Sequence, residues 1–374
     1  MHSNSQAGST DRYLAAALGL WIAAGIVFIF TLPLLPIDET RYVTVAWEMR
    51  QSGHWLLPTL NGEPYSHKPP LLMWLINLAW SVGGTEVGVA RVIPLIITVG
   101  VLGLTYRLAR ELFPSDRETP SLAVMLTLVP VFYVYGSLLM FDQMLALWIL
   151  LGLIALWRAA QAPSWKSGLL LGFAIGVGLL TKGPVILLHL LPPALLVRFW
   201  KAPEIALTRR QWSSTIIAAV AIGAATILAW AIPAAIVGGP EFAHMIFWRQ
   251  SAGRMVQSFS HRQPFWFYVP VLLVILGPLL AWPPLWRSVA TLWKPLTRPV
   301  IFILSWIVPA LVAFTAFSGK QPHYILPFLP GFAILAAHAL KGATTRKGDA
   351  IGLIALFAIL FLVLAFGPII AGAA

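Results

Sequence analysis

The sequence predicts an all-α polytopic membrane protein, and three observations support this fold class. Hydrophobic residues make up 59% of the 374 residues and charged residues only 10%, whereas a soluble domain has roughly 45–50% and 25%. Apolar stretches long enough to cross a bilayer recur along the whole chain. Basic residues concentrate in the short segments between these stretches, as expected of cytoplasmic loops.

The apolar stretches predict about eleven membrane spans, since a helix needs about 20 apolar residues to cross a bilayer. The first stretch is read as a span because it is too long for a signal-peptide core and lacks a small-residue cleavage site. The predicted spans are residues 14–35, 87–108, 120–136, 144–160, 168–180, 185–199, 212–236, 265–284, 300–317, 324–339 and 351–370.

The basic residues predict the orientation of the bundle. A cytoplasmic N-terminus puts 16 of the 25 basic residues on the inner side, as the positive-inside rule requires. The other nine lie on the outer side among Trp, Tyr, Pro and His residues, so their retention needs another reason. These nine are Arg41, Arg50, Lys68, Arg91, Lys182, Arg249, Arg254, Arg262 and Lys320.

Two segments on the outer side are long, residues 36–86 and 237–264. The first contains a helical run, 40–51, and an apolar run, 69–84, which we expect to lie along the membrane as interfacial helices. No repeat, low-complexity tract or soluble domain is visible, so we predict a single membrane domain over residues 1–374 with no soluble C-terminal domain. The net charge of +12 is scattered and does not predict nucleic-acid binding. The chain has no cysteine, which excludes thiolate metal sites.

Asp38 and Glu39 stand side by side just after the first span, in a chain with only 13 acidic residues. In one interpretation Asp38 is the N-cap of the following helix and Glu39 lies in its first turn. In the other, a carboxylate held rigidly at the membrane surface acts as a general base toward a hydroxyl or amine. The residues alone leave both open.

The first outer segment contains a turn-rich loop that gathers Glu63, Tyr65, His67 and Lys68 on the same side as Asp38. Lys68 directly precedes two prolines that start a helix. It is therefore either a residue that binds a ligand or a lysine whose ammonium reaches to the membrane interface. A lone histidine in such a loop is more often structural than a metal ligand.

Two isolated charges lie in apolar parts of the chain. Asp142 either caps a helix that begins near Gln143 or belongs to a functional site, because an acid in lipid is costly and usually functional. Lys182 lies in the sequence TKGP, whose tight turn requires glycine and proline but no lysine. An interfacial lysine is the alternative there.

The later outer segments bring further cations together with aromatic residues. Because outer arginines oppose the positive-inside trend, we expect them to meet an anion, and phosphate suits both arginine and lysine. The neighbouring aromatic residues suit an anionic group carried on a lipid tail. These residues are Arg249, Arg254, His261, Arg262, Lys320, His323 and Tyr324. No Walker loop is present, so ATP hydrolysis is not expected.

Six strings, in this order, resemble polyprenyl-phosphate-sugar glycosyltransferases of the GT-C fold. The most similar group is that of the lipid A aminoarabinose transferases and bacterial protein O-mannosyltransferases. The strings are IDETRY, YSHKPPLLMWL, FDQ, LLTKGP, HRQPFWFY and HYILPFLP, and they extend over nearly the whole chain.

The resemblance implies roles for the residues. Asp38, with Glu39 beside it, matches the acid that activates or positions the acceptor. Asp142 matches a second acid of the cavity. His67 stands where the aminoarabinose transferases have Glu, so the resemblance is a weaker guide to which acceptor this protein uses. The residues expected around the donor phosphate and sugar are Tyr65, Lys68, Lys182, Arg249, Arg254, Lys320, His323 and Tyr324. His67 and Asp142 are the candidate ligands for a divalent metal, the only cofactor considered.

We therefore expect a multi-pass protein of the bacterial inner membrane that moves a sugar from a polyprenyl phosphate carrier to a lipid, glycan or protein acceptor. The active site is expected on the periplasmic face and the reaction to invert the anomeric carbon. The alternative is a lipid-linked sugar flippase or transporter, which would also need many spans and intramembrane charges.

Overall fold

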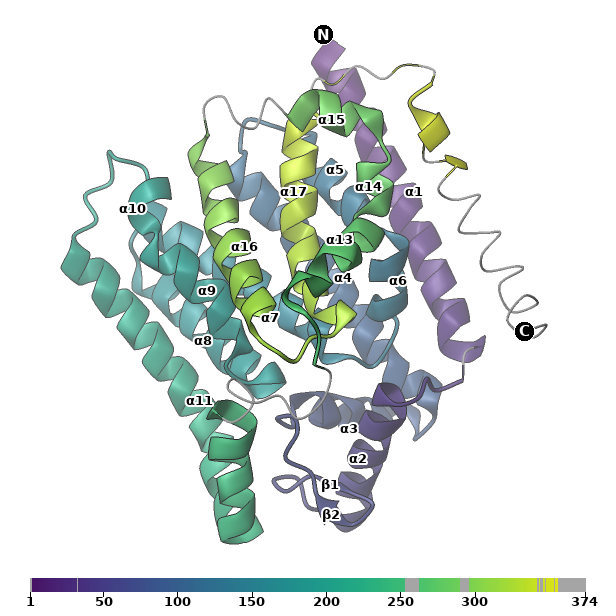
Figure 1. Cartoon of the computed structure of the whole chain (residues 1–374), viewed down its shortest axis with the longest axis vertical. Helices are drawn as coiled ribbons and strands as arrows, with labels where there is room; N and C mark the ends of the chain where they lie inside the picture. Colours follow the sequence, from purple (N-terminus) through teal and green to yellow (C-terminus); the bar gives the residue numbers. More distant parts are fainter. Residues whose placement is uncertain are drawn as a thin grey trace.

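The computed structural model describes residues 2–31, 33–252, 262–289 and 296–341, and a few residues near the C-terminal end (343, 346, 348–352 and 354–355). These form a bundle of helices with one small hairpin (Figure 1). The elements that concern the site are α1 (His2–Thr31), α2 (Asp38–Ser52), β1 (Thr59–Leu60), β2 (Glu63–Pro64), α3 (Leu71–Gly83), α4 (Val87–Leu112), α7 (Phe141–Gln161), α8 (Trp165–Lys182), α9 (Val185–Leu195), α11 (Arg209–His244), α16 (Arg298–Ala316), η4 (Pro322–Phe328) and α17 (Leu329–Ala339).

Five helices in the described part are long and apolar enough to cross a membrane, which confirms the polytopic all-α class. They are the segments Arg12–Thr31, Val87–Leu112, Phe141–Gln161, Arg209–Trp248 and Arg298–Ala316. A sixth span is formed if the bent pair α5 (Thr119–Thr127) and α6 (Pro130–Gly136) crosses as one unit. The predicted count of about eleven spans stays a prediction.

Several predicted spans are broken in the structure. Residues 120–136 form α5 and α6, which meet at 71°, and proline at the start of α6 lacks the N–H that would continue the first helix. Residues 265–284 form η2 (Phe265–Phe267), α13 (Tyr268–Ile275), α14 (Gly277–Leu280) and the start of α15 (Pro283–Val289). Most of the predicted span 351–370 lies outside the described residues.

The second outer segment was predicted to begin at residue 237, which lies within the helix α11, and this boundary stays a prediction. The helix α11 continues to His244 through a kink at Gly239, whose φ of 77° is in the left-handed region that glycine adopts readily. A π-helical stretch, η1 (Met245–Ala252), follows directly. The segment therefore leaves the bundle as a helix.

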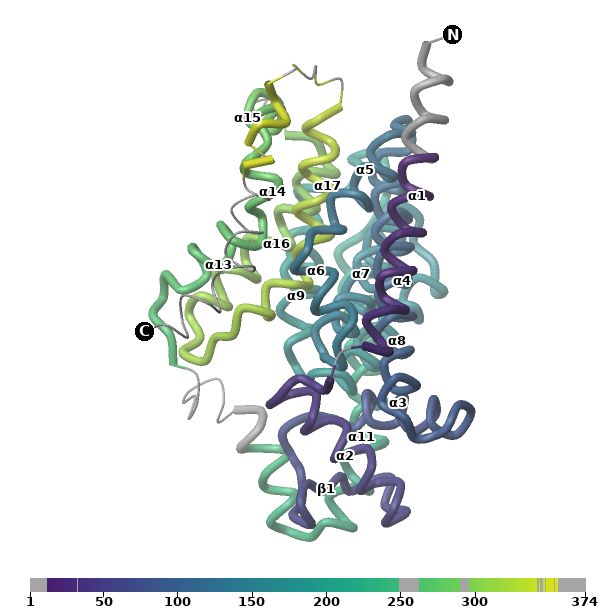
Figure 2. The backbone as a smooth tube through the Cα atoms, turned by 90° about the vertical axis from the view of Figure 1, so that its right-hand side faces the viewer, coloured from purple at the N-terminus to yellow at the C-terminus, as the bar shows by residue number. Residues whose placement is uncertain are grey.

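The first outer segment folds as a small cap at one end of the bundle, made of α2, the β1–β2 hairpin and α3 (Figures 1 and 2). The carboxylate of Glu48 holds the hairpin to α2 by accepting hydrogen bonds from the Thr59 hydroxyl at 2.7 Å and the Asn61 amide at 2.6 Å. The buried Asn77 of α3 donates to the carbonyl of Ala46 in α2 at 2.9 Å. The cap is thus a fixed support for Asp38.

Small residues bring α8 and α11 close together, as is common between membrane helices. A Cβ added at Gly172 would lie 2.8 Å from Ile222, and one added at Gly223 would lie 2.4 Å from Ile175. This packing fixes α8, and with it Lys182 at its C-terminal end.

Candidate active site

The ion pair of Asp142 and Lys182 is the centre of the candidate site. Asp142 lies in the first turn of α7, and its Oδ1 is 2.6 Å from the Lys182 Nζ at the end of α8. The two side chains are only 3% and 8% exposed. The N-cap of α7 is Met140, so the capping interpretation of Asp142 is wrong, and burial excludes an interfacial lysine at 182.

The 3₁₀ turn η4 brings two further predicted residues to this pair. The Nε2 of His323 lies 3.7 Å from the Asp142 Oδ2, and the Lys182 Nζ lies 4.1 Å from the centroid of the Tyr324 ring. Burial lowers the pKa of His323, with the nearby Asp142 acting in the opposite direction, so this imidazole is neutral at pH 7. Lys182 therefore carries the positive charge of the cluster.

Glu39 is part of a separate buried ion pair. Arg91 of α4 holds it by two hydrogen bonds, Nε to Oε1 at 3.0 Å and Nη2 to Oε2 at 2.7 Å. The backbone amides of Leu35 and Leu139 donate to the same carboxylate at 3.0 and 3.1 Å. Both side chains are at most 1% exposed. Glu39 thus joins α2, α4 and the chain entering α7.

Asp38 differs from its neighbour because its side chain is 39% exposed. It accepts a hydrogen bond from the Tyr42 hydroxyl at 3.3 Å and lies 3.6 Å from a guanidinium nitrogen of Arg41. Burial and the Asp38 charge raise the pKa of Tyr42, so this phenol keeps its proton and acts as a donor. The N-cap of α2 is Ile37, so the capping interpretation of Asp38 is wrong.

Phe141 connects Asp38 to the ion pair. The Tyr42 ring packs edge-on against the Phe141 ring, with centroids 4.8 Å apart. The Lys68 Nζ lies 5.9 Å from the centroid of the same ring. The structure thus brings Asp38, Lys68, Asp142 and its partners to one end of the bundle, as the sequence predicted.

The remaining predicted residues lie around this centre or outside the described part. The buried Tyr65 packs against His67, with ring centroids 5.2 Å apart. Lys320 is 3% exposed and donates to the carbonyl of Gln263 at 3.0 Å, so it joins two loops. The side chain of Arg249 and all of Arg254 and His261 lie outside the described residues.

His67 and Asp142 do not form a metal site in the described part of the chain. No group of three His, Asp or Glu side chains with ligand geometry is found among the described residues. One oxygen of Asp142 is already taken by an ammonium at 2.6 Å, which would repel a dication. The described donor set therefore does not fit a metal.

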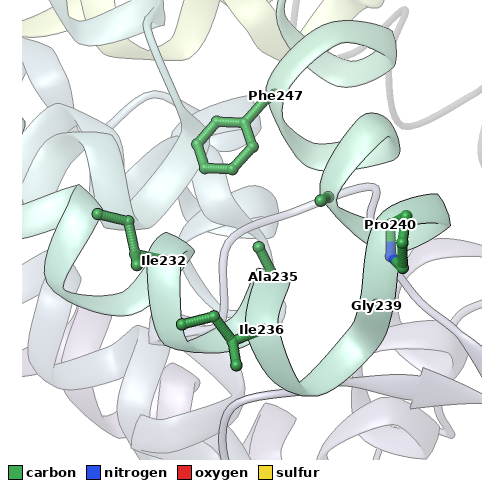
Figure 3. A pocket seen from close by; sticks show the side chains of 7 residues that line it. Ile232, Ala235, Ile236, Gly239, Pro240 and Phe247 are labelled. Atoms are coloured by element: carbon green, nitrogen blue, oxygen red, sulfur yellow. The ribbon is translucent and has the colours of Figure 1, made fainter.

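Two hollows lie away from the charged cluster. An apolar groove of about 380 Å³ opens at the kink of α11, lined by residues such as Ile236, Pro240 and Phe247 (Figure 3). A second, of about 250 Å³, lies where α4 and α17 end and is lined by Asp116 and His338 among others. The lining of the first carries no ionisable group. The second is lined by residues at the C-terminal ends of α4 and α17, and these helix ends lie opposite α2 in the bundle (Figure 1).

Comparison with known proteins shows which proteins this chain resembles. Residues 67–236 match the family described as dolichyl-phosphate-mannose-protein mannosyltransferase. The undecaprenyl phosphate-alpha-4-amino-4-deoxy-L-arabinose arabinosyl transferase of Serratia proteamaculans is 32% identical over 87% of this chain and 60% of its own length. The transferase of the same name in Pseudomonas aeruginosa is 31% identical over 89% of this chain and 61% of its own length.

Solved structures give the same result for the fold. The crystal structure of ArnT from Cupriavidus metallidurans bound to undecaprenyl phosphate superposes with a TM-score of 0.75. It is 23% identical, and the match covers 96% of this chain and 65% of that one. This chain has the GT-C fold. The resemblance to polyprenyl-phosphate-sugar glycosyltransferases is confirmed. This chain spans about three fifths of the length of the curated relatives it matches.

Sequence reasoning missed two residues that shape the site of this GT-C chain. Arg91 was noted only as an outer arginine that needed a reason, and its partner proved to be Glu39. Tyr42 was not singled out, although it lies four residues after Asp38, the spacing that brings side chains together on a helix. That spacing was the available signal.

Proposed function

We propose that this protein is a membrane glycosyltransferase that moves a sugar from a polyprenyl phosphate carrier to an acceptor at the outer face. The observation that carries the proposal is the joint position of an exposed carboxylate and a buried cation at one end of the bundle. Asp38 can reach an acceptor, while Lys182 is held where a phosphate could bind. The similarity to the arabinosyl transferases supports the same chemistry.

The proposed reaction is a single displacement at the anomeric carbon. Asp38 takes the proton of the acceptor hydroxyl or phosphate as its oxygen attacks that carbon. The bond between the anomeric carbon and the phosphate oxygen breaks, and the electron pair leaves with the polyprenyl phosphate. Lys182 and Lys68 stabilise the negative charge on the departing phosphate. Attack opposite the leaving group inverts the configuration.

Glu39 takes no part in this proposed chemistry. Its two oxygens already accept four hydrogen bonds, and its side chain is 1% exposed. We assign it the role of holding α2, and therefore Asp38, against α4. Lys320 is likewise assigned to loop packing, because its ammonium is occupied by the carbonyl of Gln263.

The names of the relatives suggest the substrates to test first. We propose undecaprenyl phosphate as the carrier and 4-amino-4-deoxy-L-arabinose as the sugar. The names give no acceptor, and we propose a membrane lipid as the first one to test. The direct test is to incubate the purified protein with the carrier-linked sugar and an extracted lipid acceptor, followed by mass spectrometry. Glycosylated product with the wild-type protein, and none with Asp38→Asn, supports the proposal. No product with any lipid, glycan or protein acceptor overturns it.

The orientation is proposed from the distribution of basic residues, with the N-terminus and the opposite end from α2 in the cytoplasm. Reporters fused after Gly62 and Gln257 should be accessible from outside the cell, and reporters fused after Pro203 and Lys294 only from inside. Reversed labelling would put the cap on the cytoplasmic side and contradict a periplasmic site.

The transporter alternative is less well supported, because the residues assigned to donor and acceptor, Lys182 and Asp38, lie at the same end of the bundle. A transporter would move the lipid-linked sugar across vesicles and would form no new glycosidic bond. Transfer by detergent-solubilised protein, in which no compartment exists, separates the two functions.

A further inference from the structure

Four buried aromatic rings, those of His189, Trp306, Phe314 and Phe328, lie directly behind the η4 turn of the site. Three of them are fully buried, and Phe314 is 6% exposed. They come from α9, α16 and the last residue of η4. We call this group the aromatic block.

A hydrogen bond lies at the centre of the aromatic block. The Trp306 indole N–H donates to the His189 Nδ1 at 3.0 Å, which places the proton of the neutral imidazole on Nε2. That Nε2 has no hydrogen-bond partner among the described residues. A buried N–H without a partner is costly, so packing alone does not account for a histidine here. Its Nδ1 is needed as the acceptor for Trp306.

Both members of this hydrogen bond hold Phe328. The Phe328 ring lies 4.7 Å from the His189 ring and stacks on Trp306 with centroids 6.1 Å apart at 17°. Trp306 itself packs closely against α17, since a Cβ added at Gly331 would lie 2.6 Å from its ring. The C-terminal end of η4 is therefore fixed from two sides.

The other end of the same turn carries two residues of the candidate site. His323 approaches Asp142, and the Tyr324 ring lies over the Lys182 ammonium. The Phe314 ring packs against both ends of the turn, since its centroid lies 5.7 Å from that of Phe328 and 6.3 Å from that of Tyr324.

We propose that His189 and Trp306 are positioning residues for the donor site, which hold η4 so that Tyr324 and His323 face Lys182 and Asp142. The inference rests on the proposed function, because the donor site is part of it. The hydrogen bond between the two side chains, rather than their bulk alone, sets the position of the turn.

The test measures binding of undecaprenyl phosphate in detergent by calorimetry, alongside thermal unfolding. Trp306→Phe and His189→Phe each remove the hydrogen bond but keep an aromatic ring. Each should weaken carrier binding about 3- to 10-fold, the range of one neutral hydrogen bond. His189→Asn, whose carbonyl can replace Nδ1 as acceptor, should bind within about 2-fold of the wild type.

Trp200→Phe is the matched control. Trp200 is also fully buried, packs against Phe302 of α16 at 4.6 Å and donates its indole N–H to the carbonyl of Pro193 at 2.9 Å. Its ring partners among the described residues include none from η4, so Trp200→Phe should lower the unfolding temperature and leave carrier affinity unchanged.

Equal carrier affinity for Trp306→Phe and Trp200→Phe would overturn the inference. If Trp306→Phe does not fold, the contrast between His189→Phe and His189→Asn decides by the same criterion. A wild-type protein that binds no undecaprenyl phosphate would instead overturn the proposed donor, and the inference with it. The two failures are therefore distinct.

Discussion

Two buried ion pairs lie at the same end of the bundle and differ in how fully their hydrogen-bonding capacity is used. The Glu39 carboxylate receives two hydrogen bonds from Arg91 and two from backbone amides. Among the described residues, the Asp142 carboxylate has a single short contact with Lys182 and a longer one with His323 at 3.7 Å. The described donors thus saturate the first carboxylate and leave acceptor positions open on the second.

The choice of cation matches this difference. Arginine presents a planar, rigid set of donors that suits a bidentate contact with a carboxylate. Lysine carries a compact charge on a flexible stem, and it can turn from Asp142 toward an incoming phosphate. Burial and charge are common to both pairs, so they do not separate a structural pair from a binding pair. We expect the less fully hydrogen-bonded pair, Asp142 and Lys182, to be the one that meets the donor phosphate.

The largest expected effect concerns Asp38, the exposed acid next to the saturated pair. Asp38→Asn keeps the size of the side chain but removes its basicity, so transfer should fall by about 10²- to 10⁴-fold, the usual contribution of a general base. The unfolding temperature should hardly change, because the side chain is 39% exposed. The measurement is turnover with the carrier-linked sugar. Substantial residual turnover in well-folded protein would exclude the general-base role.

Much of the site could be predicted from the sequence, because charges in apolar surroundings stand out. Asp142 and Lys182 were both singled out in this way, and they proved to be partners. The sequence could not predict that the Glu39 side chain is buried whereas the Asp38 side chain is exposed. Adjacent residues on a helix point about 100° apart, and only the distant Arg91 determines which acid faces the interior.

The fold class could also be predicted from composition and length, whereas the individual spans could not. Proline-rich segments look like continuous apolar runs in the sequence. In the structure they form interrupted helices, as in η4 and in the pair α5 and α6. A 3₁₀ turn at residues 322–328 has no distinctive hydrophobic period, yet it is this turn that delivers His323 and Tyr324 to the ion pair.

The second prediction contrasts the two ion pairs directly. Arg91→Met leaves Glu39 buried without its partner, which should destabilise the protein by about 3–5 kcal/mol. Lys182→Met likewise leaves the buried Asp142 without its cation, because the neutral His323 lies 3.7 Å away, so it should cost a similar amount of stability. Only Lys182→Met should also weaken carrier binding. Thermal unfolding and carrier titration of both variants test this. Equal carrier affinity of the two variants would remove the distinction between a saturated and an open pair.

The third prediction sharpens the role of the open pair. If Lys182 and Arg254 both contact the carrier phosphate, either change to Ala should weaken carrier binding by roughly 10- to 150-fold, the value of a hydrogen bond to a charged group. Since both serve one phosphate, their effects should be non-additive in a double-mutant cycle. Acceptor affinity should stay nearly constant. Additive losses would place Arg254, which lies outside the described residues, at a different site.

The smallest expected effect is a pH dependence confined to the open pair. Burial lowers the pKa of His323 below its ordinary value, so the unfolded chain binds a proton more readily than the folded protein does. Stability should therefore fall as the pH drops below about 6.5, the ordinary pKa of histidine, toward the lower folded value. His323→Asn removes this group, so its unfolding temperature should vary less between pH 7.5 and pH 5 than that of the wild type. An unchanged pH profile in His323→Asn would show that other groups cause the loss, and that the histidine beside Asp142 does not titrate in this range.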